Sequence, residues 1–191
     1  MRKYLPPDFH ALPKAAQSVF KGELFEIFQW PETMFDGSTA TFEALKRDDT
    51  VIIYAFKGDK LIIERQKQPD REHWYYSLPG GRHDHPDEDE ESAARRELQE
   101  ETGLVFKNWK LTAARQPEHK MDYIVYYFVA TDLEKEVERH LDPGEIIETL
   151  EVTFDQLMAL KDQPGTEYLH LERFEKYHSF DEIKALPDIR P

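Results

Sequence analysis

The chain has 191 residues, of which 39 are acidic and 25 are basic, so its formal net charge is -14 at pH 7. This length supports one hydrophobic core, and a hydrophobic fraction of 39% excludes a disordered chain. The complete lack of cysteine excludes disulfides, thiolate metal sites and a cysteine nucleophile. A strongly acidic protein repels polyanions, which argues against duplex nucleic acid as a partner.

The first residues contain no continuous apolar run that could be the core of a signal peptide. No later stretch approaches the roughly 20 apolar residues that a membrane-spanning helix needs. We therefore expect a cytoplasmic protein with no membrane partner.

Residues 1–48 are expected to form an extension ahead of a main domain at residues 49–191. Three prolines before residue 14 predict an irregular arm. Segments rich in β-branched and aromatic residues then predict an antiparallel meander. Its predicted strands are 18–21, 24–30 and 40–45, with a turn signal at Asp36-Gly37.

The main domain begins with a predicted hairpin, in which residues 51–56 and 61–63 are apolar strands joined by a polar turn. Strands and helices alternate irregularly after it, which predicts an α+β fold with a mixed sheet. The other predicted elements are strands at 74–78, 110–114, 123–130 and 148–152, and helices at 88–102, about 154–161 and 167–183.

Three carboxylates share one face of the helix predicted at 88–102, which Gly103 ends. Glu97, Glu100 and Glu101 stand at i, i+3 and i+4, so they fall within an arc of about 100°. Their mutual repulsion costs about 0.2–0.5 kcal/mol per pair on a solvated helix. A divalent cation would remove this cost, and magnesium and manganese prefer carboxylate oxygen. The simpler alternative is a solvated acidic face of a surface helix.

The chain around this helix resembles the signature of the Nudix family, G-x5-E-x7-R-E-U-x-E-E-x-G-U, in which U is an aliphatic residue. In one respect it differs, because the loop between Gly81 and Glu88 is one residue longer. We expect the extra residue to bulge outward and to leave the helix intact. The positions that match the signature are Glu88, Arg96, Glu97, Leu98, Glu100, Glu101, Gly103 and Leu104.

This resemblance implies the α/β/α sandwich of the Nudix fold and a set of site residues. The family's metal ligands correspond to Glu97, Glu100 and Glu101 together with the main-chain carbonyl of Gly80. The implied cofactor is Mg2+, with Mn2+ as a substitute. Arg96 and Glu88 correspond to a pair that orients these ligands.

The family also needs a proton acceptor, which in sugar-nucleotide members often comes from an acidic loop after the helix. Glu145 lies at the matching place and is the preferred general base, with a plain surface carboxylate as the alternative reading. Glu148 and Glu101 are alternative bases, and Glu100 is a further candidate catalytic residue. His83 and His85 are expected to be exposed loop residues rather than metal ligands.

The strands before residue 51 resemble those of ADP-ribose pyrophosphatases, which pair or exchange that region across a two-fold homodimer. Gln66 adds to this likeness and is a candidate substrate-binding residue. Phe28 and Trp30 could stack on a nucleobase, although packing is the commoner role of such aromatic residues. Two departures, Ser77 for a glutamate and Gln68 for an arginine, weaken the case for ADP-ribose itself.

The resulting hypothesis is Mg2+-dependent hydrolysis of ADP-ribose or another nucleoside diphosphate sugar to a nucleoside monophosphate and a sugar phosphate. Its partner is thus a small nucleoside diphosphate derivative. One alternative is a hydrolase of nucleoside triphosphates, dinucleoside polyphosphates or RNA 5' ends. Another is a catalytically silent nucleotide-binding module.

Overall fold

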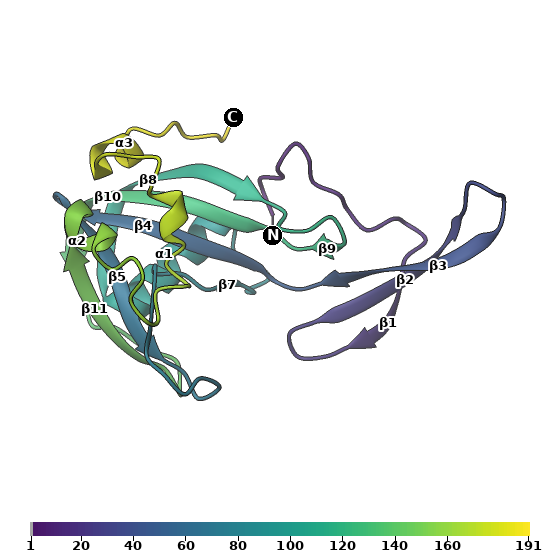
Figure 1. Ribbon diagram of the computed structural model, residues 1–191, viewed down its shortest axis with the longest axis horizontal. Helices are drawn as coiled ribbons and strands as arrows, with labels where there is room; N and C mark the ends of the chain where they lie inside the picture. Colours follow the sequence, from purple (N-terminus) through teal and green to yellow (C-terminus); the bar gives the residue numbers. More distant parts are fainter. Residues whose placement is uncertain (1) are drawn as a thin grey trace.

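The computed structural model describes residues 2–191, and within them the chain forms a large sheet in a main body and a small sheet in an extension (Figure 1). The strands of the body are β4 (Asp49–Lys57), β5 (Lys60–Lys67), β6 (Tyr75–Ser77), β7 (Arg82–His83), β8 (Leu104–Arg115), β10 (Val125–Glu136) and β11 (Ile146–Val152). Their order is β11-β5-β4-β10-β8, with β6 beside β5 and β7 beside β4. The sheet is mixed, because β10 runs parallel to β4 and antiparallel to β8.

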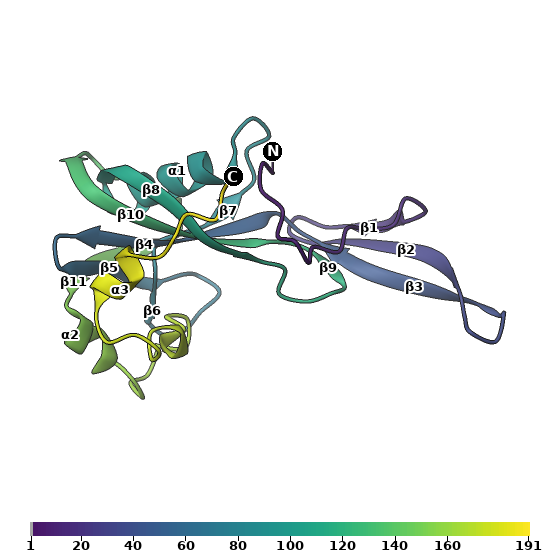
Figure 2. The ribbon, with the colours of Figure 1, turned by 90° about the horizontal axis from the view of Figure 1, so that it is seen from above.

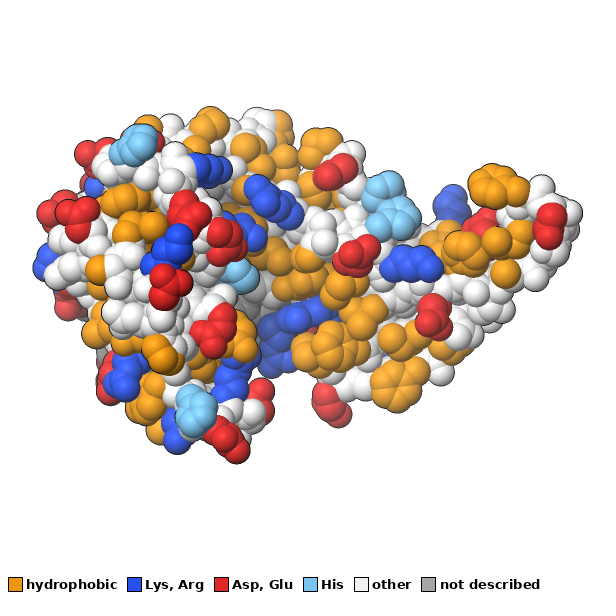
Figure 3. Space-filling model, viewed as in Figure 1, with side chains coloured by type: hydrophobic (Ala, Val, Ile, Leu, Met, Phe, Trp, Pro, Cys, Tyr) orange, Lys and Arg blue, Asp and Glu red, His pale blue; other side chains and the backbone are white. Residues whose placement is uncertain are grey.

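The small sheet projects from the body as an antiparallel meander (Figure 1). It contains β1 (Gln17–Lys21), β2 (Glu26–Thr33), β3 (Thr39–Lys46) and β9 (Met121–Asp122). The parallel pairing of β3 with β9 ties it to the body. Figure 3 shows hydrophobic side chains gathered along it. The large exposed ones are Val19, Phe20, Leu24, Phe25, Met34 and Phe35.

Helices cover both faces of the large sheet, which gives the expected α+β fold with a sandwich of layers. Helix α1 (Glu90–Thr102) lies on one face, and α2 (Phe154–Met158) lies on the other (Figure 2). The second face also carries a 3-10 turn, η1 (Leu171–Arg173), and α3 (Phe180–Lys184). None of the helices in residues 2–191 has the length and apolar composition needed to cross a membrane.

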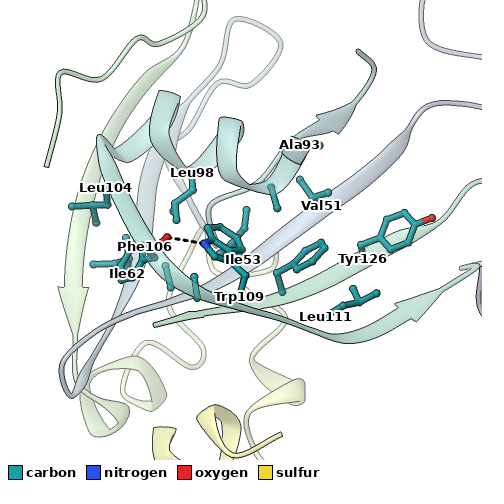
Figure 4. Close-up of a cluster of buried hydrophobic side chains, with 14 of the residues drawn as sticks. Val51, Ile53, Ile62, Ala93, Leu98, Leu104, Phe106, Trp109, Leu111 and Tyr126 are labelled. Carbon is teal, nitrogen blue, oxygen red and sulfur yellow. Dashed lines mark hydrogen bonds between the residues drawn. The ribbon is translucent and has the colours of Figure 1, made fainter. Parts of the chain in front are cut away.

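The core under α1 explains why this helix is firmly placed. Ala93 and Leu98 of α1 are buried against the sheet, and Trp109 of β8 is buried in the same cluster (Figure 4). The indole of Trp109 donates to the carbonyl of Phe106 at 3.0 Å, so its polar atom is satisfied in the core. Small residues on the helix let its backbone approach the sheet, which fixes the height of its carboxylates above the strands.

Helix α1 starts two residues later than the sequence predicts because Asp89 caps it. The Asp89 side chain accepts from the amide of Ser92 at 2.8 Å. Gly103 ends the helix in a left-handed conformation, with φ of 72°. Residues 84–87 are exposed and the helix is intact, as expected for a longer loop that bulges outward.

The hairpin of β4 and β5 opens after two residue pairs. Phe56 pairs with Leu61 and Lys57 with Lys60, and beyond them the two strands separate. The loop after β6 enters the gap, where the amide of Val51 donates to Gly81 at 3.0 Å and that of Ile53 donates to Pro79 at 2.9 Å. This insertion holds the Pro79-Gly80-Gly81 loop beside α1.

The prediction of a single helix at 167–183 is wrong. This stretch contains only the short turn η1 and the start of α3. His170 adopts a left-handed conformation with φ of 51°, which interrupts a regular helix. Leu169, Leu171 and Phe174 are each buried, so tertiary packing rather than helical periodicity organises the segment.

The N-terminal arm is irregular, as predicted, and its first residues are bound to the body. The guanidinium of Arg2 pairs with Asp49 and Asp122, each at 2.6 Å. The backbone amides of Lys3 and Tyr4 donate to the buried carboxylate of Glu90 at the start of α1.

Candidate active site

A cavity of about 800 Å³ lies where α1, the loop after β6 and residues 140–145 meet. The extension reaches it through Glu23 and Leu24. Acidic groups dominate the part of the wall formed by α1. The candidate site residues that line the cavity are Gln66, Gly80, Arg96, Glu97, Glu100, Glu101 and Glu145.

Arg96 organises the outer part of the acidic wall. Its guanidinium donates to Glu97 at 2.8 Å and to Glu100 at 3.1 Å. It also pairs with Glu88 through two nitrogens, at 2.8 and 3.2 Å. Burial opposes ionisation of Glu88, but Arg96 outweighs it and lowers the pKa of that carboxyl. At Glu97 the effect of burial prevails over that of Arg96 and raises the pKa to about 7.

Glu101 forms the inner part of the wall. It is buried at the end of α1 and accepts from the backbone amide of Gly80 at 2.9 Å. Burial, the neighbouring Glu64 and Glu97 raise its pKa well above the usual value, against the effect of that hydrogen bond. Glu101 is thus a carboxyl group whose ionisation calls for a nearby positive charge.

Glu64 of β5 was not anticipated from the sequence. Its side chain is fully buried within reach of a hydrogen bond to Glu101, and burial raises its pKa. Two carboxyl groups form such a bond only when they share a proton. With both ionised, Oε1 of Glu64 has no donor among residues 2–191.

The two glycines of the loop are needed for close approach. Gly80 has φ of 150°, and a Cβ there would lie 2.1 Å from the carbonyl oxygen of Val51. At Gly81, a Cβ would lie 2.3 Å from Oε2 of Glu97. The carbonyls of Pro79 and Gly81 accept from β4, whereas that of Gly80 has no amide donor in residues 2–191.

These donors fit a hard divalent cation. They are carboxylate oxygens and a main-chain carbonyl, and the orphaned Oε1 of Glu64 adds an uncompensated buried oxygen beside Glu101. Within residues 2–191, no three His, Asp or Glu side chains are already drawn together as a metal cluster. Glu97 and Glu100 instead turn to Arg96, and Glu101 turns to the Gly80 amide.

Glu145 lines the same cavity as the carboxylates of α1. Burial, followed by the charge of Asp142, raises its pKa. The side-chain amide of Gln68 donates to the carboxylate of Glu145 at 3.4 Å and to the side-chain carbonyl of Gln66 at 3.3 Å. Gln66 in turn donates to Ser77 at 2.6 Å, and Ser77 lies 3.5 Å from Glu64. A chain of polar contacts therefore joins Glu145 to the buried Glu64.

Other candidates lie outside the cavity wall. Glu148 is exposed and pairs with Arg65 at 3.0 Å. Phe28 and Trp30 are half-buried on β2 of the extension, and Trp30 lines a separate, smaller cavity.

The two loop histidines differ from each other. His85 is exposed at the cavity rim, as expected. The expectation that His83 is exposed is wrong, because His83 is buried in β7, where it pairs with Asp49 of β4. Its Nε2 lies 2.9 Å from the carbonyl oxygen of Glu88, so it secures the start of the loop.

Comparison with known proteins agrees with this architecture. The model of the NUDIX domain matches residues 45–174, more than half of the chain. The chain is 30% identical to ADP-ribose pyrophosphatase of Bacillus subtilis (strain 168) over 149 residues, which cover 76% of this chain and 80% of that protein. It is 26% identical to methanol dehydrogenase activator of Bacillus methanolicus over 146 residues, covering 74% and 78% of the two chains.

A solved structure, that of an ADP compounds hydrolase, has the same fold, with a TM-score of 0.65 and 20% identity. The match covers 90% of this chain and 87% of that one. The fold, the carboxylate helix and these relatives agree with one another: the chain belongs to the Nudix family and is a Nudix pyrophosphohydrolase.

Proposed function

We propose that the protein hydrolyses the pyrophosphate bond of ADP-ribose or of another nucleoside diphosphate sugar, with Mg2+ as cofactor. The observation that carries this proposal is the common cavity that Glu97, Glu100 and Glu101 share with Glu145. A candidate metal-binding wall and a candidate base thus border the same space, which supports the proposal. A nucleoside diphosphate needs both, because its anionic phosphates must be neutralised before water attacks.

In this proposal, Glu97, Glu100, Glu101 and the carbonyl of Gly80 hold the magnesium ion. An ion bound there would neutralise the diphosphate and would lower the pKa of an attacking water. Arg96, anchored by Glu88, orients the carboxylates of Glu97 and Glu100. Glu145 accepts the proton of the water, and its raised pKa suits a base that works near neutral pH.

The choice of a nucleoside diphosphate sugar rests on the ADP-ribose pyrophosphatase that is 30% identical to this chain. A panel of ADP-ribose, other nucleotide sugars, nucleoside triphosphates, dinucleoside polyphosphates and capped RNA, assayed with Mg2+, tests it. We expect the highest kcat/KM for a nucleoside diphosphate sugar, with release of a nucleoside monophosphate. Preference for a triphosphate or a capped RNA end would contradict the proposed substrate class. Nucleotide binding without turnover would contradict the proposal that the protein is catalytic.

We further propose that the extension, as part of residues 1–48, pairs two copies of the chain. Strand β1 is an edge strand whose residues are all exposed, and Val19 and Phe20 on it are apolar. Light scattering on the purified protein is expected to give the mass of a dimer. A Phe20→Glu variant is expected to shift it toward the monomer, and a monomeric wild type would contradict the proposal.

A further inference from the structure

A basic side chain is held at the cavity wall by aromatic rings. Arg71 lies in the connection between β5 and β6 and lines the cavity. Its guanidinium carbon is 4.4 Å from the ring centre of Tyr75 and 4.1 Å from that of Tyr168. Cation–π contacts with both rings hold the guanidinium group in place.

The guanidinium of Arg71 has an unused donor. Its Nη1 is buried and has no hydrogen-bond partner among residues 2–191. Arg65, on the neighbouring strand, also stacks on an aromatic ring, at 4.5 Å from Trp74, but it pairs with Glu148. A buried N–H group without an acceptor costs free energy, and this one belongs to a side chain that lines the cavity, so the side chain is suited to an incoming acceptor.

Tyr75 and Tyr168 together form a clamp on Arg71, and Tyr168 belongs to the C-terminal segment, residues 165–191. The amide of Tyr76 donates to the carbonyl of Gly165 at 2.6 Å, which docks the segment onto β6. A Cβ at Gly165 would lie 2.6 Å from the carbonyl oxygen of Trp74, so only glycine allows this approach. The docking places Tyr168 over Arg71, and Tyr75 and Tyr168 also pack edge to face at 5.0 Å.

We propose that Arg71, held against Tyr75 and Tyr168, binds a phosphate oxygen of the diphosphate. The C-terminal segment is then part of substrate recognition. The planar N–H groups of arginine match phosphate oxygens well, and the carboxylates on α1 cannot fill this role. Arg71 also supplies positive charge to a cavity in which α1 contributes Glu97, Glu100 and Glu101. This inference rests on the proposed function, because it assumes a diphosphate in this cavity.

Binding of ADP in the presence of Mg2+, measured by calorimetry, tests the inference without turnover. Arg71→Met is expected to weaken ADP binding by about ten- to a hundredfold, the effect of losing one charged hydrogen bond. The matched control Arg65→Met removes a stacked arginine outside the cavity and is expected to bind as the wild type does. Equal affinities of wild type and Arg71→Met, or no ADP binding by either, would overturn the inference.

A second pair of variants separates recognition from simple packing. Tyr168→Phe keeps the ring and is expected to bind ADP as the wild type does, whereas Tyr168→Leu is expected to weaken binding severalfold. A lower melting temperature with unchanged ADP affinity in both Arg71→Met and Tyr168→Leu would assign the clamp to packing alone. A wild type that binds ADP through Arg71 but hydrolyses no member of the substrate panel would refute the proposed function and leave this inference standing.

Discussion

The carboxyl groups of Glu64 and Glu101 lie within hydrogen-bonding reach of each other, although one comes from a strand and the other from a helix. Burial raises the pKa of both, and the charge of Glu64 raises that of Glu101 further. We therefore expect the pair to keep a proton at neutral pH in the metal-free protein. A cation bound by Glu101 must displace it, so metal binding is coupled to proton release.

Calorimetric titration with Mn2+ at pH 7 in buffers of different ionisation enthalpy measures that release. We expect the wild type to release more protons than Glu64→Gln does, because the amide of glutamine donates to Glu101 and leaves it ionised. Equal proton release by the two proteins would show that the pair holds no proton before metal binds.

Replacing Glu145 by Gln is expected to lower kcat by about 10²- to 10⁴-fold, the usual contribution of a general base, with little change in KM. Glu148→Gln is the matched control, since Glu148 pairs with Arg65 away from the cavity. A base acts when deprotonated, so the wild-type rate should rise with pH through the raised pKa of Glu145. A loss of activity that is greater in Glu148→Gln would reassign the base.

Arg96→Lys is expected to weaken Mn2+ binding by about 10- to 100-fold, the usual cost of losing a residue that orients metal ligands. Lysine keeps the charge but cannot contact Glu88, Glu97 and Glu100 together. Arg95→Lys, one residue away, is the control, because Arg95 pairs with Glu91 instead. Similar Mn2+ affinities for the two variants would refute the role of Arg96.

Gly81→Ala should affect the site much more than the fold. The added Cβ meets the flexible carboxylate of Glu97, which can turn away at little cost to folding. Displacing this ligand is expected to weaken Mn2+ binding by about tenfold or more. Thermal unfolding without metal should remain close to that of the wild type, and a large loss of stability would show instead that the backbone had moved.

The pH dependence of stability in the metal-free protein tests the burial of Glu97. Burial raises its folded-state pKa to about 7, above the value of 4.5 for a free glutamate. Its protonated form is therefore favoured by folding, and the protein loses up to about 3 kcal/mol of stability as pH rises from 4.5 through 7. Glu97→Gln should lose less stability over that range, as measured by urea unfolding. Parallel pH profiles would contradict this.

The helix and its carboxylates could be predicted because their pattern is local. Glu97, Glu100 and Glu101 share a face by helical spacing alone, whatever the rest of the chain does. The ends of this helix are also local signals, and only the cap at Asp89 shifted its start. The hairpin was predictable for the same reason, from apolar runs on either side of a polar turn.

Glu64 and Arg71 could not be found in this way, because their roles depend on contacts distant in sequence. Glu64 follows an apolar run and looks like the polar end of a strand, and only its register opposite Ser77 places it beside α1. Arg71 becomes a cavity residue through Tyr168, nearly a hundred residues later. The C-terminal segment has no periodicity to read, since single buried side chains hold it in place.

Because β4 separates from β5 to admit the loop after β6, the chain tolerates an inserted residue in some parts of this loop and not in others. Pro79 and Gly81 hydrogen bond to β4 on both sides of Gly80, so an added residue here would break the register of the sheet as well as the cavity. Beyond β7, residues 84–87 are exposed and lie outside the paired strands. The extra residue of this chain's loop can therefore be accommodated at its outer end without displacing Glu97, Glu100 or Glu101 on α1.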